Sequence, residues 1–261
     1  MKVNVILDTH RQETSIRERK IESDEYLLLR DPNFLPTRKQ LKKIFGNWGQ
    51  EDWPKWFELC FNEKEPIYEF WTEEYIGAFA DYLRGRVEEY CIILEVGAGD
   101  GRLSHFLKQK LGKRANKIKV IATDSGEYGI KPQFPVEKLT HTKALEKYKP
   151  EIVICSWMPY KVDFTADFRK CPSVMEYILI GDADDGCGDP WKTWGLPPIE
   201  SLYDPSKECE IPPYERDGFE RKNLYDLSRL QICRTDLPGS LNFFQLSHSS
   251  TVSFRRIKKR S

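Results

Sequence analysis

A chain of 261 residues is long enough for one α/β domain with a sizeable core and an appendage. Its 41 basic and 41 acidic residues cancel, so no overall charge draws it to nucleic acid or to an anionic membrane. Hydrophobic residues at 39% describe a globular protein, and no apolar run approaches the roughly 20 residues that cross a bilayer.

Residues 1–35 form a charged N-terminal segment. Residues 1–8 turn acidic too early for a secretory signal. The residues that follow are rich in both charges and lack a sustained apolar face, which predicts loose order.

Residues 36–88 are rich in aromatic side chains and predict a helical cap. Pro36 and Thr37 begin a short helix with Leu41, Ile44 and Phe45 on one side, and Gly46 ends it. Three tryptophans follow this helix, and we expect them to form part of the core of the cap; they are Trp48, Trp53 and Trp56. Thr72 then caps a longer helix with its apolar residues at helical spacing, which ends near Gly85.

The most informative motif lies at residues 95–101, Glu-Val-Gly-Ala-Gly-Asp-Gly. It follows the apolar run 91–94 and precedes a helical pattern that starts at Leu103. A strand, a glycine turn and a helix N-terminus in this order bind adenosine-containing cofactors. A dinucleotide fingerprint would place its third glycine at Arg102, whereas this chain has it at Gly101, which argues against an NAD-dependent dehydrogenase.

This Glu-x-Gly-x-Gly-x-Gly pattern resembles motif I of the class I S-adenosylmethionine (SAM)-dependent methyltransferases. The resemblance covers about residues 89–257 and implies that SAM is the cofactor. It implies that Glu95 faces the amino acid part of SAM and that Tyr68, ahead of the first strand, contacts the cofactor from a lid. The cofactor-binding residues expected on this basis are Tyr68, Glu95, Gly97, Ala98, Gly99, Gly101, Asp124, Ser125, Ser156 and Trp157.

From residue 89 onward, short apolar runs alternate with helical segments. Strands are predicted at 91–96, 118–123, 151–155 and 175–181, and their apolar character on both faces suits a buried parallel sheet. Two β-rich runs, 227–234 and 250–257, flank the turn sequence 236–239 and predict a closing antiparallel hairpin. We therefore expect an α/β fold: residues 89–261 form a seven-stranded, mostly parallel Rossmann-like methyltransferase sheet with a C-terminal antiparallel hairpin and an N-terminal helical appendage.

Asp124 follows the second predicted strand, about 25 residues after the glycine turn. A carboxylate there can accept hydrogen bonds from both ribose hydroxyls, and the resemblance implies the same role. The alternative is a helix cap formed with Ser125 and Gly126. His141 and Thr142 fall where members of the family contact adenine.

The fourth strand runs into residues 155–160, Cys-Ser-Trp-Met-Pro-Tyr. Many family members that methylate bases or amides carry Asn or Asp followed by Pro-Pro and an aromatic residue here. This chain departs from that pattern, which argues against such substrates. Trp157 either stacks on adenine, faces a cation, or packs under the sheet edge, and Ser156 is a candidate catalytic residue.

An acidic loop with four aspartates occupies residues 181–189, after the fifth strand. A calcium loop does not fit, because the glycine falls one place early and no glutamate closes the loop. Asp182 is the second candidate catalytic residue, as a general base, and the alternative is a solvated loop. Trp191 and Trp194 form either an aromatic wall with Tyr160 or part of the core. No metal site is predicted.

The primary hypothesis is methyl transfer from SAM to a nitrogen or oxygen of a small molecule or protein side chain. One alternative is a non-catalytic SAM-binding regulator or scaffold. Another is an RNA methyltransferase, with the basic residues 255–260 as a phosphate patch or nuclear address. Nucleic acid is not the favoured partner, no membrane contact is expected, and the sequence leaves the oligomeric state open. Seven scattered cysteines without a Cys-x-x-Cys pair favour a reducing compartment, the cytosol or nucleus.

Overall fold

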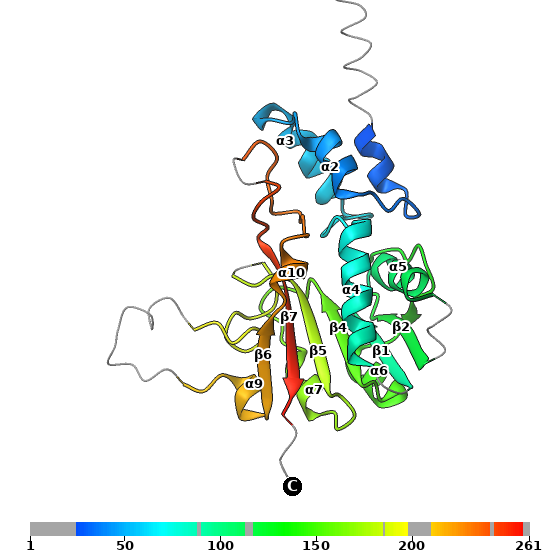
Figure 1. The fold of residues 1–261 in the computed structure, drawn as a ribbon, viewed down its shortest axis with the longest axis vertical. Helices are drawn as coiled ribbons and strands as arrows, with labels where there is room; N and C mark the ends of the chain where they lie inside the picture. The colour runs from blue at the N-terminus through cyan, green and yellow to red at the C-terminus, as the bar shows by residue number, and fades with distance from the viewer. Residues whose placement is uncertain are drawn as a thin grey trace, which may run out of the picture.

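The computed structural model describes residues 25–87, 90–112, 117–184, 186–197, 210–240 and 243–257. Its centre is a seven-stranded sheet in the order β3-β2-β1-β4-β5-β7-β6 (Figure 1). The strands are β1 (Cys91–Val96), β2 (Ile118–Asp124), β3 (Glu137–Lys138), β4 (Ile152–Ser156), β5 (Glu176–Asp182), β6 (Phe219–Asn223) and β7 (Ser249–Arg256). Strands β1 to β5 are parallel, and β7 is antiparallel to both β5 and β6. This arrangement confirms the predicted fold class.

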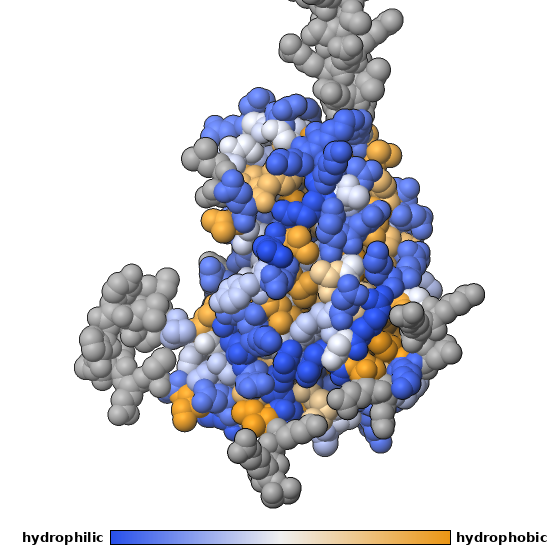
Figure 2. Space-filling model, in the orientation of Figure 1, coloured by the Kyte–Doolittle hydropathy of each residue, from blue (hydrophilic) through white to orange (hydrophobic). Residues whose placement is uncertain are grey.

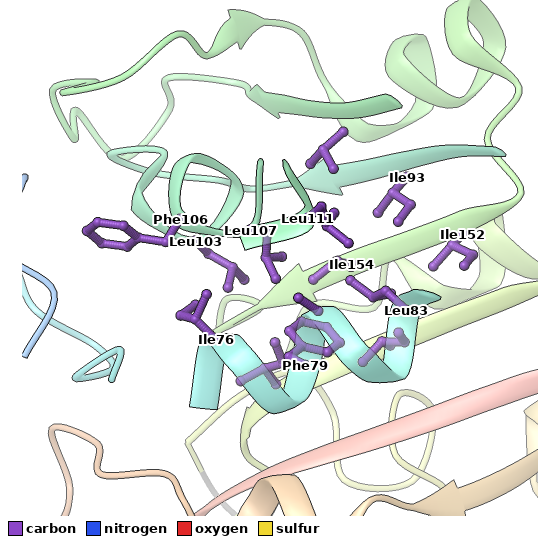
Figure 3. Packing of buried hydrophobic residues seen from close by; sticks show 14 of the residues in the cluster. Ile76, Phe79, Leu83, Ile93, Leu103, Phe106, Leu107, Leu111, Ile152 and Ile154 are labelled. Carbon is purple, nitrogen blue, oxygen red and sulfur yellow. The ribbon is translucent and has the colours of Figure 1, made fainter. Parts of the chain in front are cut away.

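Helices cover both faces of the sheet, as the two-sided apolar strands require. On one face lie α4 (Glu73–Arg86), α5 (Arg102–Leu111) and α10 (Tyr225–Ser228), and on the other lie α6 (His141–Tyr148), α7 (Thr165–Lys170) and α9 (Pro213–Arg216). Successive strand residues alternate between the two cores, so Ile93 packs on the α4 side and Leu94 on the α6 side. Figure 3 shows Ile76, Phe79 and Leu83 of α4 pointing toward α5 and the sheet.

The N-terminal elements form a cap with a core of its own. They are η1 (Glu25–Arg30), α2 (Arg38–Phe45), η2 (Gln50–Asp52) and α3 (Trp53–Cys60), and they lie at the end of the molecule opposite the carboxyl end of β7 (Figure 1). Thr37 begins α2 with a reciprocal capping box to Gln40, which confirms the predicted helix start. Trp56 is fully buried, as predicted for a core tryptophan, and its indole N–H donates to the carbonyl of Arg234 at 3.1 Å.

The cap is completed by the C-terminal part of the chain. Ile232 and Phe243 belong to the same buried cluster as Leu41, Phe45 and Trp56. Helix α4, by contrast, packs on the sheet. The division of the chain at residues 36–88 and 89–261 stays a prediction.

The predicted strand at 227–234 is wrong. The strand that pairs with β7 is β6, and residues 225–228 form the short helix α10. The apolar residues of the predicted run are divided between two cores, because Leu227 packs against α4 and Ile232 enters the cap. The true strand was missed because, apart from Phe219, it carries charged or polar residues, as is common at a sheet edge.

The turn sequence 236–239 is present but does not join the two strands of a hairpin. The Ser240 N–H donates to the carbonyl of Leu237 at 3.3 Å across Pro238 and Gly239, and the Asp236 N–H closes a preceding turn by donating to the carbonyl of Cys233 at 3.0 Å. The turn therefore closes locally, within the long connection between β6 and β7.

The predicted basic tail is also divided. Arg255 and Arg256 lie in β7, where the Arg256 guanidinium donates to the carbonyls of Val174, Arg169 and Cys171. Residues 258–260 lie outside the described part of the chain. Within the described part, a phosphate patch at this end would therefore lack two of its expected cations.

Polar side chains dominate the face shown in Figure 2, where the apolar side chains form small separate patches. None of the helices described is long and apolar enough to cross a membrane. The cysteines within the described residues are all free thiols, most of them buried in the cores.

A buried carboxylate, Glu176, ties α4 to the antiparallel end of the sheet. It is 2% exposed and accepts hydrogen bonds from Arg86 Nε at 2.7 Å, from Ser253 Oγ at 2.6 Å and from the Tyr82 hydroxyl. Arg255 Nε lies 3.6 Å from the same carboxylate. Three hydrogen-bond donors and a further guanidinium, from α4 and β7, therefore converge on one side chain.

We expect Glu176→Ala to lower the free energy of unfolding by about 3 kcal/mol, because it leaves buried donors without their acceptor. Urea unfolding measures this change. The matched control is Glu220→Ala on the exposed edge strand β6, for which we expect a change within about 0.5 kcal/mol. Equal losses in the two variants would contradict the prediction.

Candidate functional site

A cavity of about 560 Å³ lies at the carboxyl ends of β1, β2 and β4. Ligands bind at this edge of open α/β sheets, and the volume lies within the range of small-molecule sites. Its lining comes from the glycine turn after β1, the loop after β2, the segment after β4, and residues 66–71, which form a lid over it. Nine of the ten predicted cofactor-binding residues line the cavity, and the exception is Gly101.

The glycine turn follows β1 and leads into α5. Gly97 has φ +65° and a Cβ there would meet nothing within 4 Å, so the turn leaves open space on this side. Gly101 serves the fold instead. Its φ is +85°, and a Cβ at this position would lie 2.7 Å from Val136 Cγ2. Only glycine therefore allows the start of α5 to approach the segment ahead of β3.

Glu95 lies at the bottom of the cavity with 2% exposure. Its Oε2 accepts a hydrogen bond from the Ser104 backbone N–H at 3.1 Å, in the first turn of α5. Burial raises the pKa of Glu95 to about 7, although the hydrogen bonds from Ser104 stabilise the carboxylate and act to lower the pKa. A cationic group in the cavity would favour the ionised form of this carboxylate.

Asp124 connects the glycine turn after β1 with the loop after β2. Its Oδ2 accepts from the Gly99 N–H at 2.9 Å, and its Oδ1 accepts from the Gly126 N–H at 2.7 Å. No helix begins at Asp124, so the helix-cap alternative does not apply, and the carboxylate caps the turn at Gly126 instead. Asp124 and Ser125 both line the cavity, and ribose binding stays a prediction.

The last residue of β4, Ser156, and the segment after it, with Trp157 and Tyr160, contribute to the lining. Trp157 has φ +53°, a left-handed conformation that is unfavourable for a bulky residue. Its backbone N–H donates to the Ile180 carbonyl at 2.8 Å, and its indole Nε1 donates to Glu69 Oε2 at 3.0 Å. These bonds hold the strained residue with its ring facing the cavity.

His141 and Thr142, the expected adenine contacts, do not line the cavity. The His141 ring stacks on Phe164 at 4.1 Å between ring centres and bonds to Asp167. Phe164, on which the His141 ring stacks, does line the cavity.

Asp182, predicted as a general base, also lies outside the cavity lining. Its carboxylate accepts from the Asp184 N–H and from the Thr235 hydroxyl, each at 3.3 Å. Within the described residues no group of acids, histidines or cysteines could hold a metal ion, and Asp185 lies outside them. Trp194 is part of the core, and of the three predicted wall aromatics only Tyr160 lines the cavity.

Sequence reasoning missed Glu69, which belongs to the lid. It is 6% exposed, lines the cavity and accepts three hydrogen bonds, from Trp157, Ser249 and Gln231. Burial raises its pKa to about 8. The sequence feature that could have indicated Glu69 is its place as a single acidic residue in the run Ile67-Tyr68-Glu69-Phe70-Trp71. Its apolar and aromatic neighbours are typical of a buried segment, where a solvated side chain is not expected.

The cavity lining has a surplus of carboxylates. They are Glu69, Glu95, Asp100, Asp124 and Glu127. The lining contains a single guanidinium, Arg102, whose Nε lies 2.7 Å from Asp100 Oδ2. The site therefore favours a cationic ligand over an anionic one.

No protein-family model and no curated protein matches the sequence. Among solved structures, a SAM-dependent methyltransferase from Archaeoglobus fulgidus is 15% identical, with a TM-score of 0.38 over 71% of this chain and 95% of that chain. The CurJ and DszA carbon methyltransferases are 13% and 14% identical, with TM-scores of 0.34 and 0.37 over 65% and 70% of this chain. This chain covers 49% and 52% of those two chains, about half of their length. The fold assignment rests on the strand order of the sheet itself.

We expect Gly101→Ala to lower the free energy of unfolding by about 3 kcal/mol, since it adds a clash to an unfavourable backbone conformation. Gly218→Ala is the matched control, because its φ is +80° and a Cβ there would meet nothing within 4 Å. It should cost only the backbone part, about 1 kcal/mol. Denaturant melts of both variants test the difference, and equal losses would show that Val136 yields without cost.

Proposed function

We propose that this chain is a SAM-dependent methyltransferase that transfers a methyl group to a nitrogen or oxygen of a small molecule or protein side chain. The observation that carries the proposal is one cavity in which Glu95, the glycine turn and Asp124 meet at the carboxyl edge of the sheet. The strand order, with its reversed β7, is the arrangement that the resemblance at motif I implies.

The residues present fit this cofactor. Glu95 offers a buried carboxylate to the ammonium of its amino acid part, and Gly97 and Gly99 leave room for close approach of the backbone. Asp124 follows β2, the strand next to β1, where an acid can accept from ribose hydroxyls. SAM, when bound, supplies an electrophilic methyl group on a sulfonium.

The protein's own part in such a reaction is to hold the acceptor in line with the methyl group and to exclude water. Positioning of this kind can lower a barrier by roughly 7–11 kcal/mol in favourable cases. The lid of residues 66–71 covers the cavity, and Trp157 and Tyr160 provide aromatic walls at the end of β4. The surplus of carboxylates disfavours a phosphate-bearing acceptor such as RNA.

A reducing compartment, the cytosol or nucleus, fits the buried thiols. Cys155 and Cys187 lie in the core cluster beside α6, where each acts as a small hydrophobe.

Titration calorimetry with SAM tests the cofactor directly. We expect binding by the wild type and a loss of roughly tenfold or more in affinity for Asp124→Ala, because hydrogen bonds to a charged group are removed. Asp182→Asn is the matched control, since Asp182 also ends a parallel strand but does not line the cavity. No SAM binding by the folded wild type would overturn the proposal. Tight binding without formation of S-adenosylhomocysteine from cell-extract acceptors would favour the regulator alternative.

The affinity for S-adenosylhomocysteine is expected to rise with pH. Below its pKa of about 7 the Glu95 carboxyl is neutral, and above it the carboxylate attracts the ligand's ammonium. The increase between pH 6 and 7.5 should be roughly fivefold. Calorimetry on the wild type and on Glu95→Gln measures it. A pH dependence that persists in Glu95→Gln would assign the effect to another group.

A further inference from the structure

The buried carboxylate of Glu69 bears on the class of methyl acceptor, a step that rests on the proposed function. Glu69 belongs to the lid, and its neighbours Tyr68 and Trp71 also line the cavity. The lid is held by backbone hydrogen bonds to the C-terminal segment, from the Phe70 N–H to Ile232 at 2.8 Å and from the Arg234 N–H to Tyr68 at 3.0 Å. Glu69 is therefore fixed in place from both sides.

A buried chain of hydrogen bonds ends at Glu69. The Tyr75 hydroxyl and Thr251 Oγ1 are 2.8 Å apart, and Thr251 Oγ1 donates to Gln231 Oε1 at 2.8 Å. With its oxygen occupied as an acceptor, Gln231 donates through Nε2 to Glu69 Oε1 at 3.2 Å. The direction of these bonds makes Glu69 the final acceptor, which suits a carboxylate.

Two further donors point at the same group. Ser249 Oγ accepts from Gln231 Nε2 at 2.6 Å, so its own proton goes to Glu69 Oε2 at 2.8 Å. The indole of Trp157 is a donor only and also reaches Oε2. Oε1 has one donor among the described residues, Gln231, and keeps capacity to accept another from the cavity.

No described cation forms an ion pair with Glu69. The titratable groups that face it are Tyr75 of α4, Cys187 after β5, and Cys233 and Asp236 of the C-terminal segment, and none of them is cationic. Arg234 lies 4.4 Å from the Tyr68 ring centre and 3.7 Å from the Phe61 ring centre, stacked on aromatic faces. Buried carboxylates ordinarily pair with a cation, and here a ligand can supply it.

The other cavity carboxylates of the first two strands are already engaged with backbone. Glu95 accepts from the start of α5, and Asp124 links the two loops. Glu69 instead lies at the Trp157 side, near the end of β4. The Tyr68 and Trp157 rings, 5.6 Å apart between centres, add two aromatic faces of the kind that attract cations.

We propose that the methyl acceptor is an amine, and that Glu69 binds its ammonium group beside Trp157 and removes one of its protons. The proton moves to Glu69 Oε1 and frees the nitrogen lone pair. The nitrogen then forms the N–CH₃ bond as the S–CH₃ bond breaks, and the positive charge passes from sulfur to nitrogen. A carboxyl with its pKa raised to about 8 is matched to such a transfer near neutral pH.

The test compares sinefungin with S-adenosylhomocysteine by calorimetry. Sinefungin carries an ammonium at the position of the transferable methyl group, and S-adenosylhomocysteine carries no charge there. In the wild type at pH 8 we expect sinefungin to bind at least about tenfold more tightly, through a hydrogen bond between charged groups. Glu69→Gln should bring the ratio of the two affinities close to one. Glu127→Gln, a change at an exposed carboxylate of the same cavity, should leave the ratio as in the wild type.

The pH dependence of this ratio provides a second measurement that needs no variant. Both ligands share the amino acid part, so the contribution of Glu95 cancels. The sinefungin preference should increase between pH 6.5 and 8.5 as Glu69 ionises, and Glu69→Gln should abolish the increase. A purely structural role for Glu69, as a support for Trp157, would not produce this profile.

The outcomes separate the two proposals. Binding of neither ligand by the folded wild type would overturn the proposed function itself. Binding of both ligands with a ratio that is independent of pH, or unchanged in Glu69→Gln, would overturn the role of Glu69 alone. Extract metabolites separated on ion exchangers test the acceptor class: turnover confined to the anionic fraction would overturn an amine acceptor, and turnover with the cationic fraction would support it.

Discussion

The short pairing of the lid with the C-terminal segment is the constraint on which the cavity depends. Glu69 and Cys233 form an isolated antiparallel bridge, with backbone hydrogen bonds on both sides of it. Without this pairing the position of the lid, residues 66–71, relative to the glycine turn would not be fixed. The bridge also brings Gln231 to Glu69, and Ser249 at the start of β7 donates to the same carboxylate, so the lid and its buried carboxylate are positioned together.

Much of the fold and nine of the residues that line the cavity could be predicted from the sequence because their causes are local. Apolar runs predicted the parallel strands other than β3, Thr37 and Thr72 predicted the helix starts, and the glycine spacing predicted the turn. Glu69 could not be predicted, since its partners Gln231 and Ser249 are 162 and 180 residues away. Strand β6 was missed because a charged edge strand lacks the hydrophobic pattern of a buried one.

Trp157, with its strained backbone, combines a local sequence pattern with a contact to a distant part of the chain. Its sequence neighbourhood differs from the pattern common in base and amide methyltransferases, and the structure places the ring against the lid. The left-handed backbone is held by one bond to β5 and one to Glu69. A carboxylate from a distant segment thus lies beside the residues that follow β4.

The cap core has a consequence for how the chain is completed during synthesis. Leu41, Phe45 and Trp56 emerge early, yet they share their cluster with Ile232 and Phe243. The indole N–H groups of Trp53 and Trp56 likewise donate to backbone carbonyls that lie 185 and 178 residues further along the chain. Contacts of such long range are entropically expensive to form first. The N-terminal helices therefore cannot complete their core on a growing chain until Ile232 and Phe243 have emerged. The lid over the cavity, which is bonded to Ile232 and Arg234, is fixed at the same late stage.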